Sequence, residues 1–135
     1  MQKWEASYIA GIIDGEGTIT LTRMHRREHR RPCITIASTD KELLFYLQTI
    51  TGGTISDKKN YSPNKHKDSY TLTIKNKDSV LMILRSVEFY LRVTKKRKRA
   101  LWILNNYEKV TPRNGKYSSE MLNKKLEFEK EFFLL

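Results

Sequence analysis

The sequence predicts an α+β domain in which a helix–strand–strand unit occurs twice and further helices follow, giving an αββαββα core with extra C-terminal helices. Segments with strict apolar/polar alternation come in two pairs, which is the pattern of half-buried antiparallel strands. Runs with apolar residues three and four positions apart surround each pair, and this is the spacing of amphipathic helices. The 135 residues, 39% of them hydrophobic, suffice for one core, so we expect a single domain over residues 1–135.

The first unit is expected to begin and end with a helix and to hold two strands between them. Gly15 and Gly17 should end the first helix, because glycine relieves the strain of leaving a helix. Ser38, Thr39 and Asp40 each offer an N-cap to the second helix. The elements are expected over residues 5–14 (helix, with Tyr8, Ile9, Ile12 and Ile13 as its apolar stripe), 18–22 and 33–37 (strands) and 41–50 (helix).

The second unit starts after Gly52 and Gly53 and repeats the order. Asp78 or Ser79 should cap the helix after its two strands, and residues 111–115 predict a turn before the last helix. The elements are expected over residues 54–56 and 69–74 (strands), 78–90 (helix), 95–108 (helix, with Ala100, Leu101, Leu104 and Tyr107 inward) and 118–132 (helix, with Met121, Leu122, Leu126 and Phe133 inward). The four strands then form one antiparallel sheet.

Positive charge is abundant and clustered. The chain carries 26 Lys and Arg against 15 Asp and Glu, a net charge of +11. One basic run alone would indicate only a solvated surface. Three runs, in residues 23–31, 58–77 and 92–99, favour a shared anionic partner, of which nucleic acid is the commonest.

Membrane and secreted proteins are excluded by the same sequence. No stretch approaches the roughly 18 apolar residues of a membrane span, so we expect no membrane partner. The first residues carry acids and no small-residue cleavage site, which argues against a signal peptide. Cys33 is the one cysteine and has no internal disulfide partner, so an intracellular, reducing compartment is expected.

One face of the predicted sheet is rich in hydroxyl groups. Apolar residues alternate with Thr or Ser in the strands, and Arg and Lys flank them. Threonine alone would indicate no more than a good strand former. Together with the basic fringe, however, this face suits a concave saddle that lies on a nucleic-acid groove, where two-stranded ribbons fit.

The end of the first predicted helix combines small, apolar and acidic residues. Ser7, Gly11 and Gly15 are four positions apart and share one helix face, where a second helix can approach closely. Glycine inside a helix costs about 0.5–1 kcal/mol relative to alanine, and packing against a twin helix would offset that cost. Asp14 and Glu16 would then meet the partner's equivalents, where hard divalent cations neutralise paired carboxylates.

Residues 9–17 (IAGIIDGEG) resemble the LAGLIDADG motif of the LAGLIDADG homing endonuclease family. The positions that match are Ala10, Gly11, Ile13, Asp14 and Gly17, while Ile9, Ile12, Gly15 and Glu16 are conservative or common variants. The resemblance covers most of the chain, because the αββαββα order, the basic hairpins and the lysine-rich start of a later helix also fit. It implies the same α+β fold, with a four-stranded antiparallel DNA-binding saddle.

A single copy of the motif implies a homodimer, since single-motif members of the family pair two chains. Two-fold symmetry implies a near-palindromic target in double-stranded DNA. Each ribbon, at ~3.3 Å per residue, spans roughly one turn of duplex, so the target is about twenty base pairs long. The interface is expected at Ser7, Ala10, Gly11, Asp14 and Gly15.

The resemblance further implies hydrolysis of a phosphodiester in each strand, with Mg²⁺ or another divalent cation such as Mn²⁺ and with no organic cofactor. Glu16 is then a metal ligand and the backbone carbonyl of Gly15 a second one. Asp14, the third residue of the site, forms interfacial hydrogen bonds. The nucleophile is water that the metal activates.

Two further catalytic residues follow from the same resemblance. A lysine is implied near the active site at the start of the helix over 95–108, where Lys95 or Lys96 fits and we favour Lys95. Its charge would stabilise the transition state. Family members often carry Gln after the second strand, but this chain reads Ser38-Thr39-Asp40 there, so Ser38 is our choice for ordering solvent.

DNA contacts are expected from both hairpins and from the hydroxyl-rich face. Arginine suits guanine edges through its two-pronged guanidinium, whereas lysine and hydroxyl groups mostly contact phosphate. The expected contact residues are Thr20, Thr22, Arg23, His25, Arg26, Arg27, Arg30, Arg31, Thr35, Lys58, Asn60, Tyr61, Lys65, Lys67, Thr71 and Thr73.

The alternative is a protein of this fold that binds nucleic acid without cutting it, either an RNA-splicing maturase or a DNA-binding regulator. Loss of the motif acids is the usual sign of such proteins. Because Asp14, Glu16 and the lysine run are present, the sequence favours an endonuclease of the kind that serves intron homing.

Overall fold

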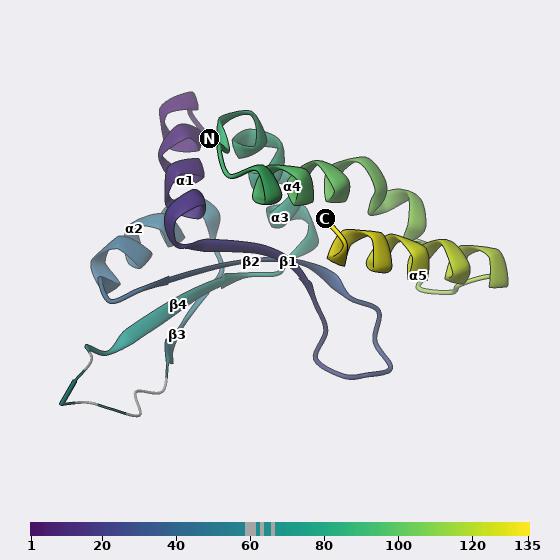
Figure 1. The fold of residues 1–135 in the computed structure, drawn as a ribbon, viewed down its shortest axis with the longest axis horizontal. Helices are drawn as coiled ribbons and strands as arrows, with labels where there is room; N and C mark the ends of the chain where they lie inside the picture. Colours follow the sequence, from purple (N-terminus) through teal and green to yellow (C-terminus); the bar gives the residue numbers. More distant parts are fainter. Residues whose placement is uncertain (59–61, 63, 66) are drawn as a thin grey trace.

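The computed structural model describes residues 1–58, 62, 64–65 and 67–135, and it has the element order that the sequence predicts. The elements, shown in Figure 1, are α1 (Lys3–Glu16), β1 (Gly17–Thr22), β2 (Arg31–Ser38), α2 (Lys41–Thr51), β3 (Thr54–Lys58), β4 (Ser69–Ile74), α3 (Lys77–Val87), the 3₁₀ turn η1 (Glu88–Tyr90), α4 (Thr94–Asn106), the 3₁₀ turn η2 (Glu108–Val110) and α5 (Ser119–Phe133). The predicted α+β class is therefore confirmed.

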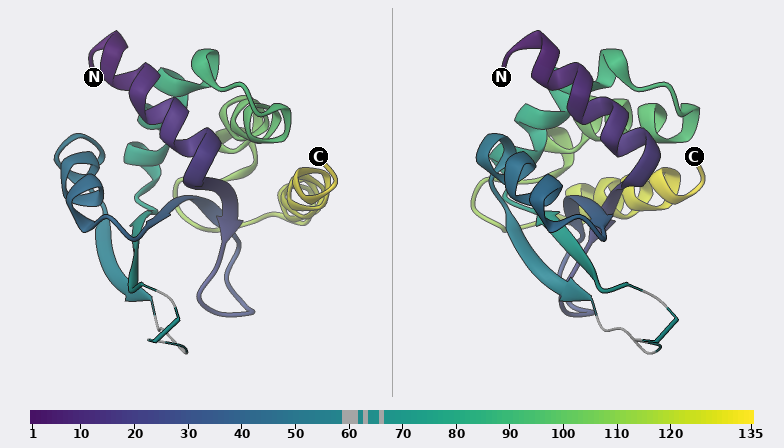
Figure 2. Two further views of the ribbon diagram at one scale, coloured as in Figure 1. Left: turned by 60° about the vertical axis from the view of Figure 1, so that its left-hand side comes forward. Right: turned by 90° about the vertical axis from the view of Figure 1, so that its left-hand side faces the viewer.

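The four strands form one antiparallel sheet in the order β1-β2-β4-β3, so the two hairpins meet through their second strands. Figures 1 and 2 show the helices on one face of this sheet and the two hairpin ends diverging below it. The other face is left free of helices. This confirms the four-stranded sheet and supplies an open surface.

Alternation along the strands decides which side chains face the helices. Ile19 pairs with Ile34, and Ile34 pairs with Ile74, so one apolar row runs across three strands. All three residues are at most 1% exposed, as are Leu44 and Leu84 on the covering helices. Full burial of such a side chain contributes about 1.5–3 kcal/mol, so burial of this layer stabilises the packing of the helices on the sheet.

The start and end of individual helices differ from expectation at two positions. Gly15 does not end α1, which continues to Glu16, and Gly17 is the residue at its C-cap. A Cβ on Gly17 would lie 2.8 Å from Cα of Ile13, so only glycine fits where α1 turns into β1. The N-cap of α3 is Asn76, whose side chain accepts a hydrogen bond from the backbone N–H of Ser79.

The apolar stripe of α1 is rotated relative to the predicted one. Ala6 and Ala10 are buried beside Ile9 and Ile13, whereas Tyr8 is 44% exposed. Small side chains occupy part of the inward face because α1 packs closely on α3 and the sheet. The outward face therefore carries large and small residues together.

The inward face of α5 also differs from expectation. Lys125, Phe128 and Phe132 are buried, while Leu122 and Leu126 stay exposed. Apolar residues occur on more than one side of this helix, and aromatic contacts of Phe128 with Trp102 and Tyr107 decide which side faces inward. In α4 the buried residues are Ala100 and Ile103, with Tyr107 just beyond, and Leu101 and Leu104 are only partly buried.

Within the described part of the chain, no helix has both the length and the apolar content needed to cross a bilayer.

Candidate active site and DNA-binding surface

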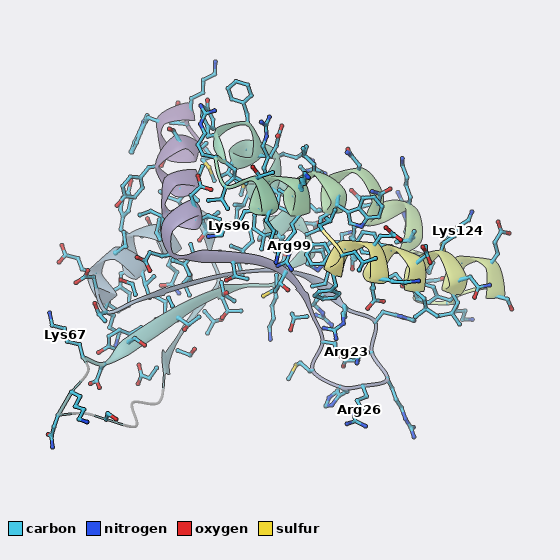
Figure 3. The ribbon with its side chains drawn as sticks, in the orientation of Figure 1. Arg23, Arg26, Lys67, Lys96, Arg99 and Lys124 are labelled. Carbon is cyan, nitrogen blue, oxygen red and sulfur yellow. The ribbon has the colours of Figure 1, made fainter. Side chains whose placement is uncertain are left out.

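The end of α1 is joined to the start of α4 by side chains from both helices. Nζ of Lys96 donates hydrogen bonds of 2.8 Å to the backbone carbonyls of Ile13 and Asp14. Carbonyls in the last turn of a helix lack partners within the helix and carry its negative dipole end, so a lysine is well placed there. Figure 3 shows Lys96 pointing from α4 toward this junction.

Asp14 completes the junction from the opposite side. Its two carboxylate oxygens accept hydrogen bonds from the backbone N–H groups of Arg92 and Val93, at 2.9 and 3.0 Å. Both oxygens are thus used within the chain, just ahead of α4. Asp14 thus positions the start of α4, and its roles at a dimer interface and in catalysis stay predictions.

The two lysine candidates differ in their contacts. Lys95 is exposed and forms no hydrogen bond or ion pair with a described residue, whereas Lys96 contacts the end of the motif helix. Successive side chains on a helix point about 100° apart, so a one-residue shift decides which lysine faces α1. The lysine that contacts α1 is therefore Lys96, and the catalytic role of either lysine stays a prediction.

Glu16 is the last residue of α1 and is exposed to solvent. It forms no hydrogen bond or ion pair with the described residues, so its carboxylate is free to bind a cation. No three His, Cys, Asp or Glu side chains gather in the described part of the chain. At the end of α1, therefore, the carboxylate of Glu16 is free of contacts with the described residues, whereas that of Asp14 is engaged.

The outward face of α1 carries the small-residue stripe. Ser7, Gly11 and Gly15 are all exposed, and no atom lies within 4 Å of where a Cβ on either glycine would be. Trp4 and Tyr8, which are 63% and 44% exposed, lie on the same outward side. A second helix could approach this face closely.

Ala10 does not belong to that face. Its side chain is 0% exposed and lies in the core of its own subunit. The helix period places it one residue before Gly11 and so about 100° around the helix. The expected interface therefore keeps Ser7, Gly11 and Gly15 and loses Ala10.

The helix-free face of the sheet carries hydroxyl groups in register. Thr18 pairs with Thr35, Thr35 with Thr73, and Thr73 with Thr54, which gives one row across all four strands. Neighbouring positions on this face are Thr20, Thr22 and Thr71, each partly exposed. The predicted hydroxyl-rich face is present as one continuous surface.

Cys33 lies in this surface, opposite Thr20. It is 3% exposed, and burial raises the pKa of its thiol, although the nearby Lys75 acts in the opposite direction. A buried neutral thiol reacts slowly with oxidants. Beside it, a cavity of about 190 Å³ opens between the strands and is lined by Thr22, Arg31, Thr73 and Lys75, among others.

Most of the predicted basic contact residues reach solvent around this face. Figure 3 shows Arg23 and Arg26 on the β1–β2 loop and Lys67 at the end of the other hairpin's loop, just before β4. The exposed members of the predicted set are Arg23, His25, Arg26, Arg27, Arg31, Lys65 and Lys67. Lys58 ends β3, and Asn60 and Tyr61 lie outside the described residues.

Arg30 is the exception among the loop arginines. Its guanidinium lies 3.6 Å from Oε1 of Glu129 on α5, donates to the carbonyl of Leu21 and stacks over the ring of Phe133. These contacts direct Arg30 toward α5 and away from the open face. Within the chain Arg30 therefore joins the β1–β2 loop to α5, and its part in DNA contact stays a prediction.

Ser38 ends β2 in phase with Ile34 and Ile36, on the helix side of the sheet. Its Oγ accepts a hydrogen bond of 2.9 Å from the backbone N–H of Asp40 and so shapes the turn into α2. Its role in ordering solvent stays a prediction.

Arg99 is a residue near the site that the sequence reading missed. It lies one turn beyond Lys96, donates to the carbonyl of Ile19 at 3.0 Å and stacks over the ring of Phe132. Burial lowers the pKa of its guanidinium. The signal was available, because residues three apart in the basic run at the start of α4 share a helix face.

This geometry agrees with comparisons to known proteins. The family model described as "LAGLIDADG-like domain" matches residues 3–88, which include the motif helix, the whole sheet and α3.

The chain belongs to the LAGLIDADG family.

Solved structures of this family share the fold with little sequence identity. The homing endonuclease I-CvuI, in complex with the I-CreI target and Mg, has a TM-score of 0.73 at 19% identity over 98% of this chain and 82% of its own. The archaeal intron-encoded homing endonuclease I-Vdi141I, complexed with DNA, has a TM-score of 0.63 at 18% identity over 99% and 85%. I-SmaMI, bound to uncleaved DNA with calcium ions, has a TM-score of 0.65 at 18% identity, but only 45% of its chain is covered. No protein with a curated description matches the chain.

Proposed function

We propose that this LAGLIDADG-family chain is a site-specific endonuclease that cuts both strands of double-stranded DNA as a homodimer, with Mg²⁺ or another divalent cation such as Mn²⁺. The observation that carries the proposal is the free, exposed carboxylate of Glu16 at the end of a helix with a small-residue outer face. This carboxylate lies where α1 enters the sheet whose open face is rich in hydroxyl groups.

Homodimerisation is proposed because the end of α1 in one chain supplies a single free carboxylate, that of Glu16. A two-fold axis along the stripe of Ser7, Gly11 and Gly15 brings two Glu16 carboxylates to one place, whereas a single chain supplies one. Two-fold symmetry also doubles the sheet surface and gives a near-palindromic target of about twenty base pairs. The partner copy thus completes the site.

Each residue at the junction has a distinct role in the proposed reaction. Glu16 and the backbone carbonyl of Gly15 would hold the cation, which would supply Lewis-acid polarisation of the phosphate and an acidified water molecule. Lys96 holds the end of α1 in place through its two carbonyl contacts and adds positive charge where the transition state is anionic. Asp14 fixes the start of α4, from which Lys96 extends.

DNA is held by the open face of the sheet and by its basic fringe. The hydroxyl groups of Thr20, Thr22, Thr35, Thr71 and Thr73 share that face, and the exposed arginines and lysines of the two hairpins surround it. Short hydroxyl groups contact base edges or phosphates, and long cations neutralise the backbone. Lys58, Asn60 and Tyr61 stay in the proposed contact set.

The non-cleaving alternative, a maturase or DNA-binding regulator, has less support because both Glu16 and Lys96 are present and placed at the junction. We also propose an intracellular, reducing location on account of the buried free thiol of Cys33. An intron or intein around the reading frame would supply the target as its joined flanking sequence.

The experiment uses a plasmid carrying that joined flanking sequence, incubated with the purified protein and an excess of Mg²⁺. We expect one double-strand break, which stops when EDTA removes the cation and returns with added Mg²⁺ or Mn²⁺. Binding to the same DNA without a break in any divalent cation would favour the non-cleaving alternative. Continued cleavage in EDTA would exclude the metal-dependent mechanism.

A further inference from the structure

A second basic site lies at the side of the sheet, next to α5 and away from the motif helix. A cavity of about 330 Å³ opens there between β2, the end of β4, the start of α3 and α5. Its basic lining residues are His29, Arg30, Arg31, Lys75, Lys77 and Lys125.

Positive charge in this cavity is only partly neutralised. The carboxylate of Glu129 is shared between His29 at 3.9 Å and Arg30 at 3.6 Å, and Asp78 follows Lys77 in the first turn of α3. Arg31, Lys75 and Lys77 form no ion pair within the described part of the chain. Such a concentration of unpaired cations repels itself unless an anion binds among them.

Lys125 is the most unusual of these residues. Its side chain is 1% exposed, in a position on α5 where an apolar residue would pack, and its ammonium lies 4.3 Å from the ring centroid of Tyr107. Nζ donates one hydrogen bond, of 2.7 Å, to the hydroxyl of Thr111, which in turn donates to the carbonyl of Tyr107. Two of its three N–H donors find no acceptor among the described residues, although Lys125 lines the cavity.

Burial of an ammonium without a carboxylate partner is unfavourable, and it lowers the pKa of Lys125 to about 8. The group is still charged at neutral pH. An anion in the cavity would supply acceptors for the remaining N–H groups and would stabilise the charged form.

The position of the cavity indicates where such an anion comes from. Arg31 and Lys75 line both this cavity and the one on the hydroxyl-rich face, so the two cavities are neighbours at the start of β2 and the end of β4. The backbone of a duplex that lies on the sheet can therefore continue past the last strand residues toward α5. The first turn of α3, whose N-cap Asn76 also lines the cavity, adds the positive end of a helix dipole.

We propose that this cavity binds a phosphate of the DNA backbone beyond the stretch that contacts the strands, with Lys125 as its buried anchor. The inference rests on the proposed DNA-binding function and extends the DNA-binding surface to α5. A backbone phosphate carries no base information, so the site adds affinity and register without sequence preference.

The test measures the salt dependence of binding to a fluorescein-labelled 40-bp duplex of mixed sequence by anisotropy, for the full chain and three variants. Lys125→Met and Lys77→Gln each remove one cation of the cavity, and Lys77 is exposed, so its replacement leaves the core intact. Lys124→Met is the matched control, because Lys124 is on the same helix but exposed and paired with Glu120 at 3.2 Å. Figure 3 shows Lys124 on the outer part of α5.

We expect Lys125→Met and Lys77→Gln to weaken binding about threefold to tenfold at 150 mM salt and to lower the slope of log K against log salt by about 0.9 for one lost phosphate contact. Lys124→Met should leave the slope as in the wild type. If both cavity variants keep the wild-type slope and affinity, the inference fails while DNA binding stands. If the wild type does not bind duplex DNA at all, the proposed function is wrong, and this inference, which rests on it, is wrong as well.

A second measurement distinguishes a backbone phosphate from a free one. Inorganic phosphate is titrated into the wild type and Lys125→Met while the melting temperature is followed. Phosphate could raise the melting temperature of the wild type and not that of Lys125→Met, while both cavity variants keep the wild-type salt slope of DNA binding. These two results together would assign the cavity to free phosphate and overturn the DNA assignment. A lower salt slope of DNA binding in the cavity variants supports the assignment to a DNA phosphate.

Discussion

Replacement of Lys125 by Met is expected to stabilise the folded protein, although it removes a hydrogen bond. Burial lowers the pKa of this ammonium from 10.5 to about 8, which corresponds to about 3 kcal/mol of free energy against the charged form. Methionine keeps the aliphatic volume without the charge. It loses the contact with Thr111, worth about 1 kcal/mol, and the cation–π contact with Tyr107, worth up to about 1 kcal/mol.

The net expectation at pH 7 is a gain of about 1–2 kcal/mol in the free energy of unfolding, or roughly 3–6 °C in melting temperature. The pH dependence provides a sharper signature. Because the pKa of Lys125 is lower in the folded chain than in the unfolded chain, the unfolded chain binds more protons between about pH 8 and 10.5. The stability of the wild type relative to the variant should therefore rise through this window, by up to about 1.4 kcal/mol per pH unit.

The assay is urea unfolding of wild type, Lys125→Met and Lys124→Met at several pH values between 7 and 10, read as the difference between proteins. Differences are needed because burial also raises the pKa values of Cys33, Tyr107 and Tyr117, which titrate in the same range. Lys124→Met should follow the wild type. A Lys125→Met variant that is destabilised by 1 kcal/mol or more at pH 7, with no relative change up to pH 10, would refute the reasoning.

Three other predictions concern the motif helix, the lysine and the loop. Gly11→Leu should weaken the dimer at least tenfold without unfolding the monomer, since no atom lies within 4 Å of the added Cβ. Sedimentation measures the mass of the particle in solution, and an unchanged dimer would count against the interface. Lys96→Met should lower the cleavage rate by about 10²-fold or more, whereas the cleavage rate of Lys95→Met should stay within about threefold of the wild type. Equal losses of cleavage rate in the two variants would contradict the assignment of the catalytic role to Lys96. Arg30→Ala should lower the free energy of unfolding by about 1 kcal/mol, because it removes the contacts with Glu129 and Leu21. Arg26→Ala should leave that free energy unchanged and weaken DNA binding, because Arg26 is exposed; chemical denaturation and anisotropy measure the two effects.

The features that could be predicted from the sequence are those that depend on a local repeat of residue types, every two residues in a strand or about every four in a helix. The alternation of apolar and hydroxyl residues predicted the hydroxyl-rich face, because successive side chains of a strand point to opposite faces of the sheet. The four-residue spacing of Ser7, Gly11 and Gly15 likewise placed them on the exposed side of α1. Glu16 followed from the motif, whose register is fixed along one helix.

The features that could not be predicted depend on contacts between distant segments. The hydrogen bond from Val93 to Asp14 joins residues 79 positions apart, and nothing local at Asp14 indicates it. The choice of Lys96 over Lys95 depends on how α4 is rotated against α1. No periodic signal indicates that Arg30, together with His29, meets Glu129 on α5.

The α5 helix shows a further reason for such misses. Its sequence carries apolar residues on two sides, so Leu122 and Leu126 were as suitable for the core as Phe128 and Phe132. The aromatic contact between Phe128 and Trp102 on α4 decides between them, and it brings Lys125 inside with them. Because a buried lysine opposes the usual pattern, period-based reasoning places it outside.

The central claim is that the free carboxylate of Glu16 makes this protein an endonuclease, and the most direct test is Glu16→Gln, which removes the charge and keeps the shape. The measurement is double-strand cleavage of the cognate site in Mg²⁺, with binding to the same DNA followed in parallel. Glu127→Gln serves as the control, because Glu127 is exposed on α5 and forms no hydrogen bond or ion pair with the described residues. The account predicts loss of cleavage by about 10³-fold or more with DNA affinity kept within about threefold, and Glu127→Gln unchanged. A Glu16→Gln protein that cuts at the wild-type rate would contradict the account.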